Sequence, residues 1–444
     1  LVLEALKERG VMRKNAPHLV HDLGFVVPNY EWWEAGFYGI GLRLYDVMAG
    51  KQGFGRSKNL SKQKTIDYLP TIETEGLRGG VVYYDGQFDD ARMVIDLVKT
   101  AADQGACLVN YLRAEDIIHE NETTRGVRAK CAETGKEYEI RGKVVINATG
   151  PFVDGLRKKD NPNAKKMISP SQGVHIVLDR KFLPGEFAIM VPETDDGRVL
   201  FAIPWHDCVM IGTTDTPIDE SPLEPRAMEE ELDFLLTHAR RYLTEDPEPS
   251  DVLSVFVGIR PLVSGEDETK TSALSRDHTL HISETGLITI AGGKWTTYRK
   301  MAQDTINQAG LLAELDMRRC VTEDLRLHGY HAHSETFGDL RLYGSDASHI
   351  EDLVRAREDW REKLHPEGPW AVGEVVWATR HEMARTVEDF LSRRTRALLL
   401  GAKRSIEMAP KVAAVMAREM DKDAAWEESQ VTAYTKLARH YYLE

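Results

Sequence analysis

The sequence predicts an α/β (α+β) protein with a separate helical domain, and three stretches of the chain support this class. Residues 287–299, LITIAGGKWTTYR, read as a buried strand that passes through two glycines into a helix. Residues from about 165 to 265 alternate as the strands of an antiparallel sheet do, apart from a helix at 226–243. Beyond about 320 the chain is charged, with Val376, Met383, Val387, Phe390 and Leu391 on one helical face.

The first part of the chain is predicted to alternate helices and strands. Residues 1–12 have apolar side chains near helical spacing. A helix at 89–105 is capped by Asp89 or Asp90 and ended by Gly105, and we interpret Asp90 and Arg92 as structural. A strand at 107–111 follows. A hairpin pair at 127–147 then runs into Thr149 and Gly150, where the backbone either approaches a ligand closely or makes a left-handed turn without one.

Composition excludes several classes of protein. A formal net charge of −14 over 444 residues argues against nucleic acid as a partner. No window approaches the roughly 18 consecutive apolar residues of a membrane helix, and residues 1–444 show no signal-peptide pattern, although we expect further residues before Leu1. The four cysteines show no CxxC spacing, which predicts neither a disulfide framework nor a metal site and fits a reducing cytosol.

The glycine pair Gly292 and Gly293 marks the clearest candidate binding site. Glycine lets the backbone approach a ligand, and the free N–H groups of a following helix favour an anion. Lys294 adds a positive charge there, and Thr296 and Thr297 add hydroxyl groups. The alternative is an ordinary strand, turn and helix without a ligand.

Two titratable side chains lie in otherwise apolar strands. His175, in GVHIVL at 173–178, is either a structural histidine or a group that faces a ligand. Arg260, between Ile259 and Pro261, needs a partner, which is either a substrate anion or a buried carboxylate.

Strings spread through the chain resemble the FAD-dependent glycerol-3-phosphate dehydrogenases, which have the D-amino-acid-oxidase-like flavoprotein fold. The strings occur in the family's order, and residues 374–396 are similar to its C-terminal domain. They are APHLV (16–20), YYDGQFDDAR (83–92), VVINATGPFVD (144–154), SQGVHIVLD (171–179), FAIPW (201–205), IGTTDT (211–216), GIRPLV (258–263), SRDHTL (275–280) and AGGKWTTYRKMA (291–302).

The resemblance implies a fold and a set of site residues. The fold is a Rossmann-like FAD-binding domain at 1–164 and 266–318, with interleaved substrate-domain segments in its first part, a mainly antiparallel substrate domain at 165–265 and a helical domain at 319–444. His175, Arg260 and Lys294 are implied as catalytic residues, and these three with Arg276 as substrate-binding residues. The implied FAD-binding residues are Thr149, Gly150, Gly292, Gly293, Lys294, Trp295, Thr296 and Thr297.

The implied reaction is oxidation of sn-glycerol 3-phosphate at C2 to dihydroxyacetone phosphate, in glycerol or glycerophospholipid metabolism, with hydride transfer to FAD. His175 is the first choice as general base and Arg260 the rival, as a stabiliser of the alkoxide. Electrons would pass to a membrane quinone. That implies a cytoplasmic protein peripheral to the inner face of the cytoplasmic membrane, with a homodimer allowed.

Alternatives from other classes are an oxidase that uses oxygen, an amine or amino-acid oxidase of the same fold, and a catalytically inactive, flavin-free fragment. The last is raised by one departure from the family: the chain shows no GxGxxG turn, so we expect at least one βαβ unit of about 30 residues to be missing. On that expectation, residues 1–444 expressed alone would be flavin-free and poorly soluble.

Overall fold

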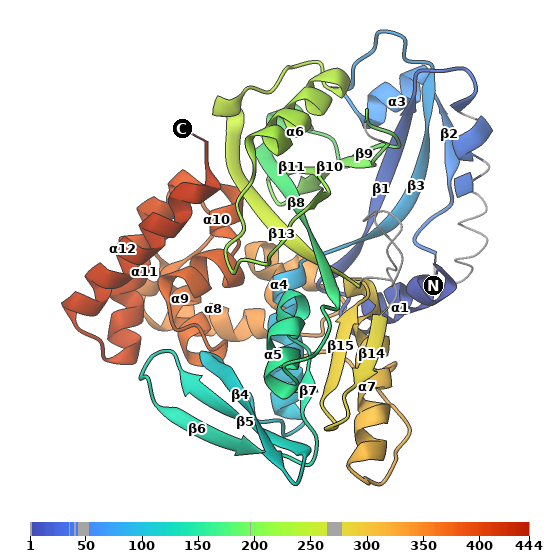
Figure 1. Ribbon diagram of the computed structural model, residues 1–444. Coiled ribbons are helices and arrows are strands. Elements are labelled where there is room, and N and C mark those ends of the chain that lie inside the picture. Colours follow the sequence, from blue (N-terminus) through green and yellow to red (C-terminus); the bar gives the residue numbers. More distant parts are fainter. Residues whose placement is uncertain are drawn as a thin grey trace.

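The computed structural model describes residues 2–34, 36–39, 41–42, 53–195, 197–263 and 278–443. Figure 1 shows a large sheet at the top of the view, smaller sheets below it and the C-terminal helices along one side. The predicted α/β class with a helical C-terminal domain is confirmed.

The large sheet has nine strands among the described residues, in the order β12, β8, β11, β10, β9, β1, β3, β2, with β13 also paired to β8. Neighbouring strands are antiparallel except for β1 and β9. The strands are β1 (Val20–Asn29), β2 (Lys58–Ser61), β3 (Gly79–Phe88), β8 (Ile168–Asp179), β9 (Ala188–Val191), β10 (Leu200–Trp205), β11 (Cys208–Gly212), β12 (Thr216–Pro217) and β13 (Val252–Val263).

One face of the large sheet is a closed apolar core. Helix α6 (Glu229–Tyr242) packs there, and Leu235 of that helix meets Val174 and Ile176 of β8 in one buried cluster. Helix α3 (Lys62–Tyr68) lies near the other end of the sheet. Alternation along β8 therefore directs His175 to the opposite face.

In the described part of the chain, two small sheets and four helices lie below the large sheet in the view of Figure 1. Strand β15 (Ile288–Gly292) pairs in parallel with β7 (Ile146–Asn147) and antiparallel with β14 (His278–Ile282). The other sheet contains β4 (Leu112–Glu120), β5 (Thr123–Cys131) and β6 (Glu137–Arg141). The helices are α1 (Val2–Asn15), α4 (Asp90–Asp103), α5 (Val153–Asp160) and α7 (Tyr298–Leu312), which follows a short helical turn at Trp295–Thr297.

The strand expected at 107–111 does not form, and this prediction is wrong. Tyr111 has a φ of 55°, which a strand does not allow, and the Val109 side chain is 63% exposed. The Asn110 side chain donates to the Met383 carbonyl, and the Tyr111 hydroxyl donates to Asp389 at 2.7 Å. This stretch therefore binds the C-terminal domain through side chains, whereas a strand would use its backbone.

The helix predicted at 89–105 is observed as α4, and the Asp89 side chain accepts the Arg92 N–H as the predicted cap. The C-terminal domain contains α8 (Ala347–Ala356), α9 (Val372–His381), α10 (Ala397–Leu400), α11 (Ala402–Met420) and α12 (Ala424–Ala438). Its apolar core includes Val177 and Cys208 of the large sheet. No helix within the described ranges is both long and apolar enough to span a bilayer.

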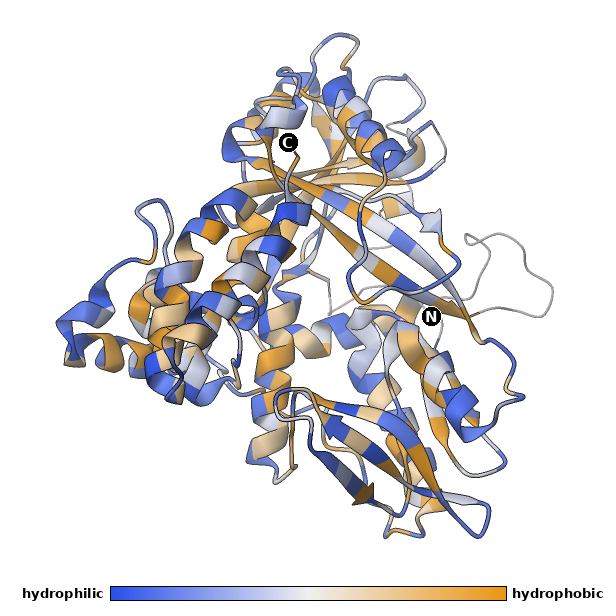
Figure 2. Cartoon of the chain, turned by 60° about the vertical axis from the view of Figure 1, so that its left-hand side comes forward, coloured by the Kyte–Doolittle hydropathy of each residue, from blue (hydrophilic) through white to orange (hydrophobic). Residues whose placement is uncertain are grey.

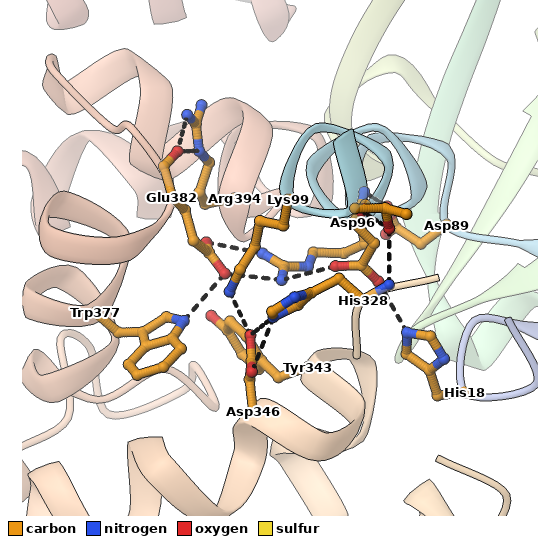
Figure 3. A network of polar contacts seen from close by, with 12 residues as sticks. His18, Asp89, Asp96, Lys99, His328, Tyr343, Asp346, Trp377, Glu382 and Arg394 are labelled. Carbon is orange, nitrogen blue, oxygen red and sulfur yellow. Dashed lines mark hydrogen bonds and ion pairs between the residues drawn. The ribbon is translucent and has the colours of Figure 1, made fainter. Parts of the chain in front are cut away.

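A buried ionic network joins α4 to the C-terminal domain (Figure 3). The Arg92 guanidinium donates two hydrogen bonds, at 2.9 and 2.8 Å, to the Glu382 carboxylate, and both side chains are at most 3% exposed. Burial raises the pKa of Glu382, but the charge and hydrogen bonds of Arg92 outweigh burial and hold that pKa below its usual value. Trp377 donates to the same carboxylate at 3.2 Å.

We expect Arg92→Met to lower the free energy of unfolding by about 3–5 kcal/mol, because it leaves the Glu382 charge buried without its partner. The double variant Arg92→Met, Glu382→Gln should recover part of that loss, since Gln keeps an acceptor for Trp377 and carries no charge. Urea unfolding measures both, and Arg355→Met, in an exposed pair with Glu351, is the control. A double variant less stable than Arg92→Met would contradict this account.

Candidate active site

The two titratable residues found in apolar strands lie on the same face of the large sheet. His175 pairs across the strands with Phe256 of β13, and the two rings stack with centroids 5.0 Å apart and planes 10° apart. Arg260 is on β13, four residues after Phe256, so its side chain leaves the sheet on the same side. Strands β8 and β13 thus present a histidine and an arginine side by side.

Two glycines make room for these side chains. A Cβ atom at Gly173 would lie 2.5 Å from Nη2 of Arg260, and a Cβ at Gly212 would overlap the His175 ring. Any other residue at either position would displace a site residue. The guanidinium of Arg260 therefore lies over the backbone of β8, and the imidazole of His175 over that of β11.

Arg260 is oriented by one short segment, which follows β11. Its guanidinium donates to the Thr213 hydroxyl at 3.1 Å, to the Thr214 carbonyl at 3.0 Å and to the Asp215 carboxylate at 3.3 Å. The Ser171 hydroxyl of β8 donates to the same oxygen of Asp215. The side chain of Arg260 remains 34% exposed, so it can also meet a ligand.

His175 is held neutral at physiological pH. Burial, and secondarily the positive charge of Arg260, lower the pKa of His175 to about 4. Nδ1 of the ring is buried and has no hydrogen-bond partner in the described part of the chain. Because Nδ1 is enclosed, Nε2 is the ring nitrogen left as a candidate for contact with a ligand.

The predicted glycine turns lie at the end of β13 that carries Arg260. Strands β7 and β15 are parallel, so Thr149–Gly150 and Gly292–Gly293 follow them at the same edge of the small sheet. Val263 of β13 packs in one cluster with Ala291 of β15, which brings the two sheets together (Figure 1). The φ angles of Gly150, Gly292 and Gly293 are 59°, 71° and 81°, a region that favours glycine.

The remaining predicted site residues, 294–297 and Arg276, do not all lie in one environment. Lys294 is exposed and, within the described ranges, makes no ion pair. Trp295 packs edge-on against Phe88 and Tyr298, as a core residue does. Thr296 is half-buried, and the buried Thr297 hydroxyl donates to the Lys294 carbonyl at 3.0 Å. Arg276 lies outside the described residues.

Sequence reasoning missed Thr213 and Asp215 as partners of Arg260. The available signal was the polar run TTDT at 213–216, directly after the apolar strand that ends at Gly212. That run was recognised as part of a resemblance, but nothing in it indicated an arginine 45 residues away.

Two family profiles match the chain. The profile described as "FAD dependent oxidoreductase" matches residues 1–299, and that described as "C-terminal domain of alpha-glycerophosphate oxidase" matches residues 283–427.

Several relatives carry the name glycerol-3-phosphate dehydrogenase. The mitochondrial protein of Macaca fascicularis is 38% identical over 98% of this chain, and the chain spans 64% of that relative's length. The mitochondrial protein of Schizosaccharomyces pombe is 34% identical, over 99% of this chain and 77% of its own length. The structure of glycerol-3-phosphate dehydrogenase from Bacillus halodurans complexed with FAD superposes with a TM-score of 0.82, at 28% identity, over 98% of this chain and 85% of that one.

The lowered pKa of His175 predicts that the stability of the parent depends on pH differently from that of His175→Asn. An unfolded histidine binds a proton below its ordinary pKa of 6.5, whereas folded His175 resists protonation down to about 4. Unfolding therefore takes up a proton between those values, and this contribution to stability is lost as the pH falls through that window. In urea unfolding at several pH values, His175→Asn should lose stability less steeply than the parent between pH 6.5 and pH 4.

Above pH 6.5 the free energies of unfolding of the parent and of His175→Asn should differ by a constant amount, because His175 is then neutral in the folded and in the unfolded state. Curves of unfolding free energy against pH that run parallel between pH 6.5 and pH 4 would show that His175 titrates normally.

Proposed function

This chain belongs to the FAD-dependent oxidoreductase family, among the glycerol-3-phosphate dehydrogenases, and we propose that it oxidises sn-glycerol 3-phosphate to dihydroxyacetone phosphate. The observation that carries the proposal is the pairing of a neutral, acceptor-competent His175 with Arg260 on one sheet face. That face ends beside the glycine turns of the small sheet.

The residues present fit a dinucleotide at that edge. Gly150 has open space where its Cβ would lie, and the positive φ angles at Gly292 and Gly293 turn the backbone out of β15. We propose Thr149, Gly150 and residues 292–297 as the part of the FAD site that this chain supplies, with Trp295 supporting the turn from its core position. When bound, FAD accepts the hydride that leaves the substrate.

The side chains of this chain would then bind and orient the alcohol. Nε2 of neutral His175 accepts the proton of the C2 hydroxyl, which a protonated imidazole could not do. Arg260 stabilises negative charge at the substrate, either on the phosphate or on the developing alkoxide. Lys294 and Arg276 are proposed as further cations for the phosphate.

We propose a membrane quinone as the electron acceptor, with oxygen as the alternative, and peripheral contact with the inner face of the cytoplasmic membrane. One surface feature supports the membrane contact. Trp32, Trp33 and Phe37 are 79%, 46% and 66% exposed, and the rings of Trp33 and Phe37 touch each other. Amphipathic aromatic rings of this kind favour a bilayer interface.

The function is tested by supplying glycerol 3-phosphate to the FAD-loaded protein with a quinone or dye, with oxygen alone and with NAD. Reduction of quinone or dye, with no NADH formed, is expected. Hydrogen peroxide formed at a comparable rate would favour the oxidase, and substrate-dependent NADH without dye reduction would contradict the proposal.

Arg260→Ala should raise the KM for glycerol 3-phosphate by about 100-fold or more, the effect of losing a charge-assisted contact of about 3 kcal/mol. Bound flavin, measured by absorbance, should be unchanged, because Arg260 lies on β13 of the large sheet and the proposed FAD-binding residues follow strands of the small sheet. An unchanged KM would remove Arg260 from the site.

The double variant Trp32→Ala, Phe37→Ala should weaken binding to phosphatidylcholine vesicles by at least about tenfold, since burying one such ring contributes about 1.5–3 kcal/mol. Vesicle cosedimentation measures this. Leu223→Ala is the control, because Leu223 is 80% exposed and lies on another part of the chain. Equal loss in the control would show nonspecific adsorption.

A further inference from the structure

The orientation of Arg260 depends on a segment that has few strand contacts of its own. All of the acceptors described above for Arg260 belong to residues 213–215, which link the end of β11 to the two-residue strand β12. A link of this kind needs other contacts to hold its side chains in place.

Alternate residues of the link, together with Thr216, the first residue of β12, point to opposite sides of the sheet. Thr213 and Asp215 bind Arg260 on the site face. Thr214 and Thr216 point to the other face, where their hydroxyls donate to one oxygen of Glu231 at 2.9 and 2.6 Å. The side of the link that faces away from the site is therefore held by the Glu231 carboxylate and by the Val174 N–H of β8, which donates to the Thr214 hydroxyl at 3.0 Å.

Glu231 is an unusual residue to find at this place. It is 4% exposed and, in the described part of the chain, no Lys, Arg or His pairs with it. Its other oxygen accepts from Gln172 Nε2 at 2.6 Å and from the Met228 N–H at 3.0 Å. Four neutral donors and the N-terminal end of α6 thus compensate the buried charge.

Gln172 extends this attachment to β8. Its side-chain amide donates to Glu231 and to the Arg226 carbonyl, and its backbone pairs with Thr216 of β12. On the same strand, Ser171 donates to Asp215 on the site face. Glu231 therefore fixes the link relative to β8, the strand that also carries His175.

We propose that Glu231, which lies behind the sheet and touches no substrate, is a positioning residue that sets the orientation of Arg260 through Thr214, Thr216 and the link. This rests on the proposed function for its kinetic consequence, but the structural coupling can be measured without turnover. Replacing Glu231 with Gln leaves one acceptor oxygen for four donors and sets an amide donor against two of them, so we expect the attachment of the link to loosen. The acceptors of Arg260 move with it.

The kinetic test compares Glu231→Gln with Glu230→Gln in the FAD-loaded protein. Glu230 is exposed and in the same turn of α6, so it controls for charge and helix effects. We expect Glu231→Gln to raise the KM for glycerol 3-phosphate about five- to tenfold with kcat within about twofold, and Glu230→Gln to change neither. An unchanged KM in Glu231→Gln would overturn the proposal.

A double-mutant cycle separates positioning from general destabilisation. In an Arg260→Lys background, where the guanidinium contacts are already lost, Glu231→Gln should raise KM less than twofold further. Full additivity of the two effects would overturn the proposal. If Glu231→Gln fails to fold, Thr216→Val replaces it in both measurements, with Thr216→Ser expected to restore the parent KM because Ser keeps the hydroxyl.

Hydrogen–deuterium exchange gives a readout that is independent of the reaction. Glu231→Gln or Thr216→Val should speed amide exchange in peptides covering 212–217, whereas Glu230→Gln and Thr216→Ser should not. Faster exchange without any oxidation of glycerol 3-phosphate by the parent protein would reject the proposed function and keep the coupling of Glu231 to the link. Unchanged exchange in both disruptive variants would reject the coupling itself.

Discussion

The antiparallel pairing of β8 with β13 determines how the site is built. It runs from Ile168 and Val263 at one end to Leu178 and Val252 at the other, so it reaches from the C-terminal helices to the small sheet that contains β15. Because side chains alternate along a strand, the same pairing places Val174 and Ile176 in the apolar core and His175 on the open face. A slip of β8 by one residue would exchange its two faces and turn the imidazole toward the aliphatic core, away from the guanidinium.

The helical domain is attached to this framework by charge as well as by apolar packing. Arg92 of α4 and Glu382, just past α9, are separated by 290 residues in sequence and share two hydrogen bonds in a buried seam. Figure 3 shows Asp96, Lys99 and Asp346 close to the same seam. An ion pair buried in this way contributes little net stability. It disfavours other packing arrangements of the helical domain, because every misplaced charge would lose its partner. In Figure 2 the C-terminal helices carry both apolar and polar stripes, as expected of a domain that packs through one face.

Local features of the sequence predicted the elements well, and long-range partners could not be predicted. The cap of α4 was found because Asp89 lies three residues before the N–H that it accepts. The need of Arg260 for a partner was inferred, with a carboxylate as one option, and the structure provides Asp215 alongside remaining exposure for a ligand. Which carboxylate it is depends on strand order, which the sequence does not state. The strand expected at 107–111 failed for the same reason: a strand needs a neighbour, and the side chains of this stretch bind Met383 and Asp389 of the C-terminal domain instead.

The net charge of this chain bears on how the proposed site would capture an anion. With a formal net charge of −14, the long-range field of the chain repels a phosphate ester, so attraction must come from nearby cations. Arg260 alone is a weak attractor, because Asp215 at 3.3 Å offsets much of its charge while fixing its direction. In the proposed reaction, therefore, Arg260 binds the substrate anion in a fixed direction through a charge-assisted contact and adds little to its long-range attraction. The exposed Lys294, which has no ion pair in the described part of the chain, contributes the uncompensated charge. On the proposed function, a guanidinium oriented by a carboxylate would fix the direction of the bound anion, and an ammonium that remains in water would add attraction.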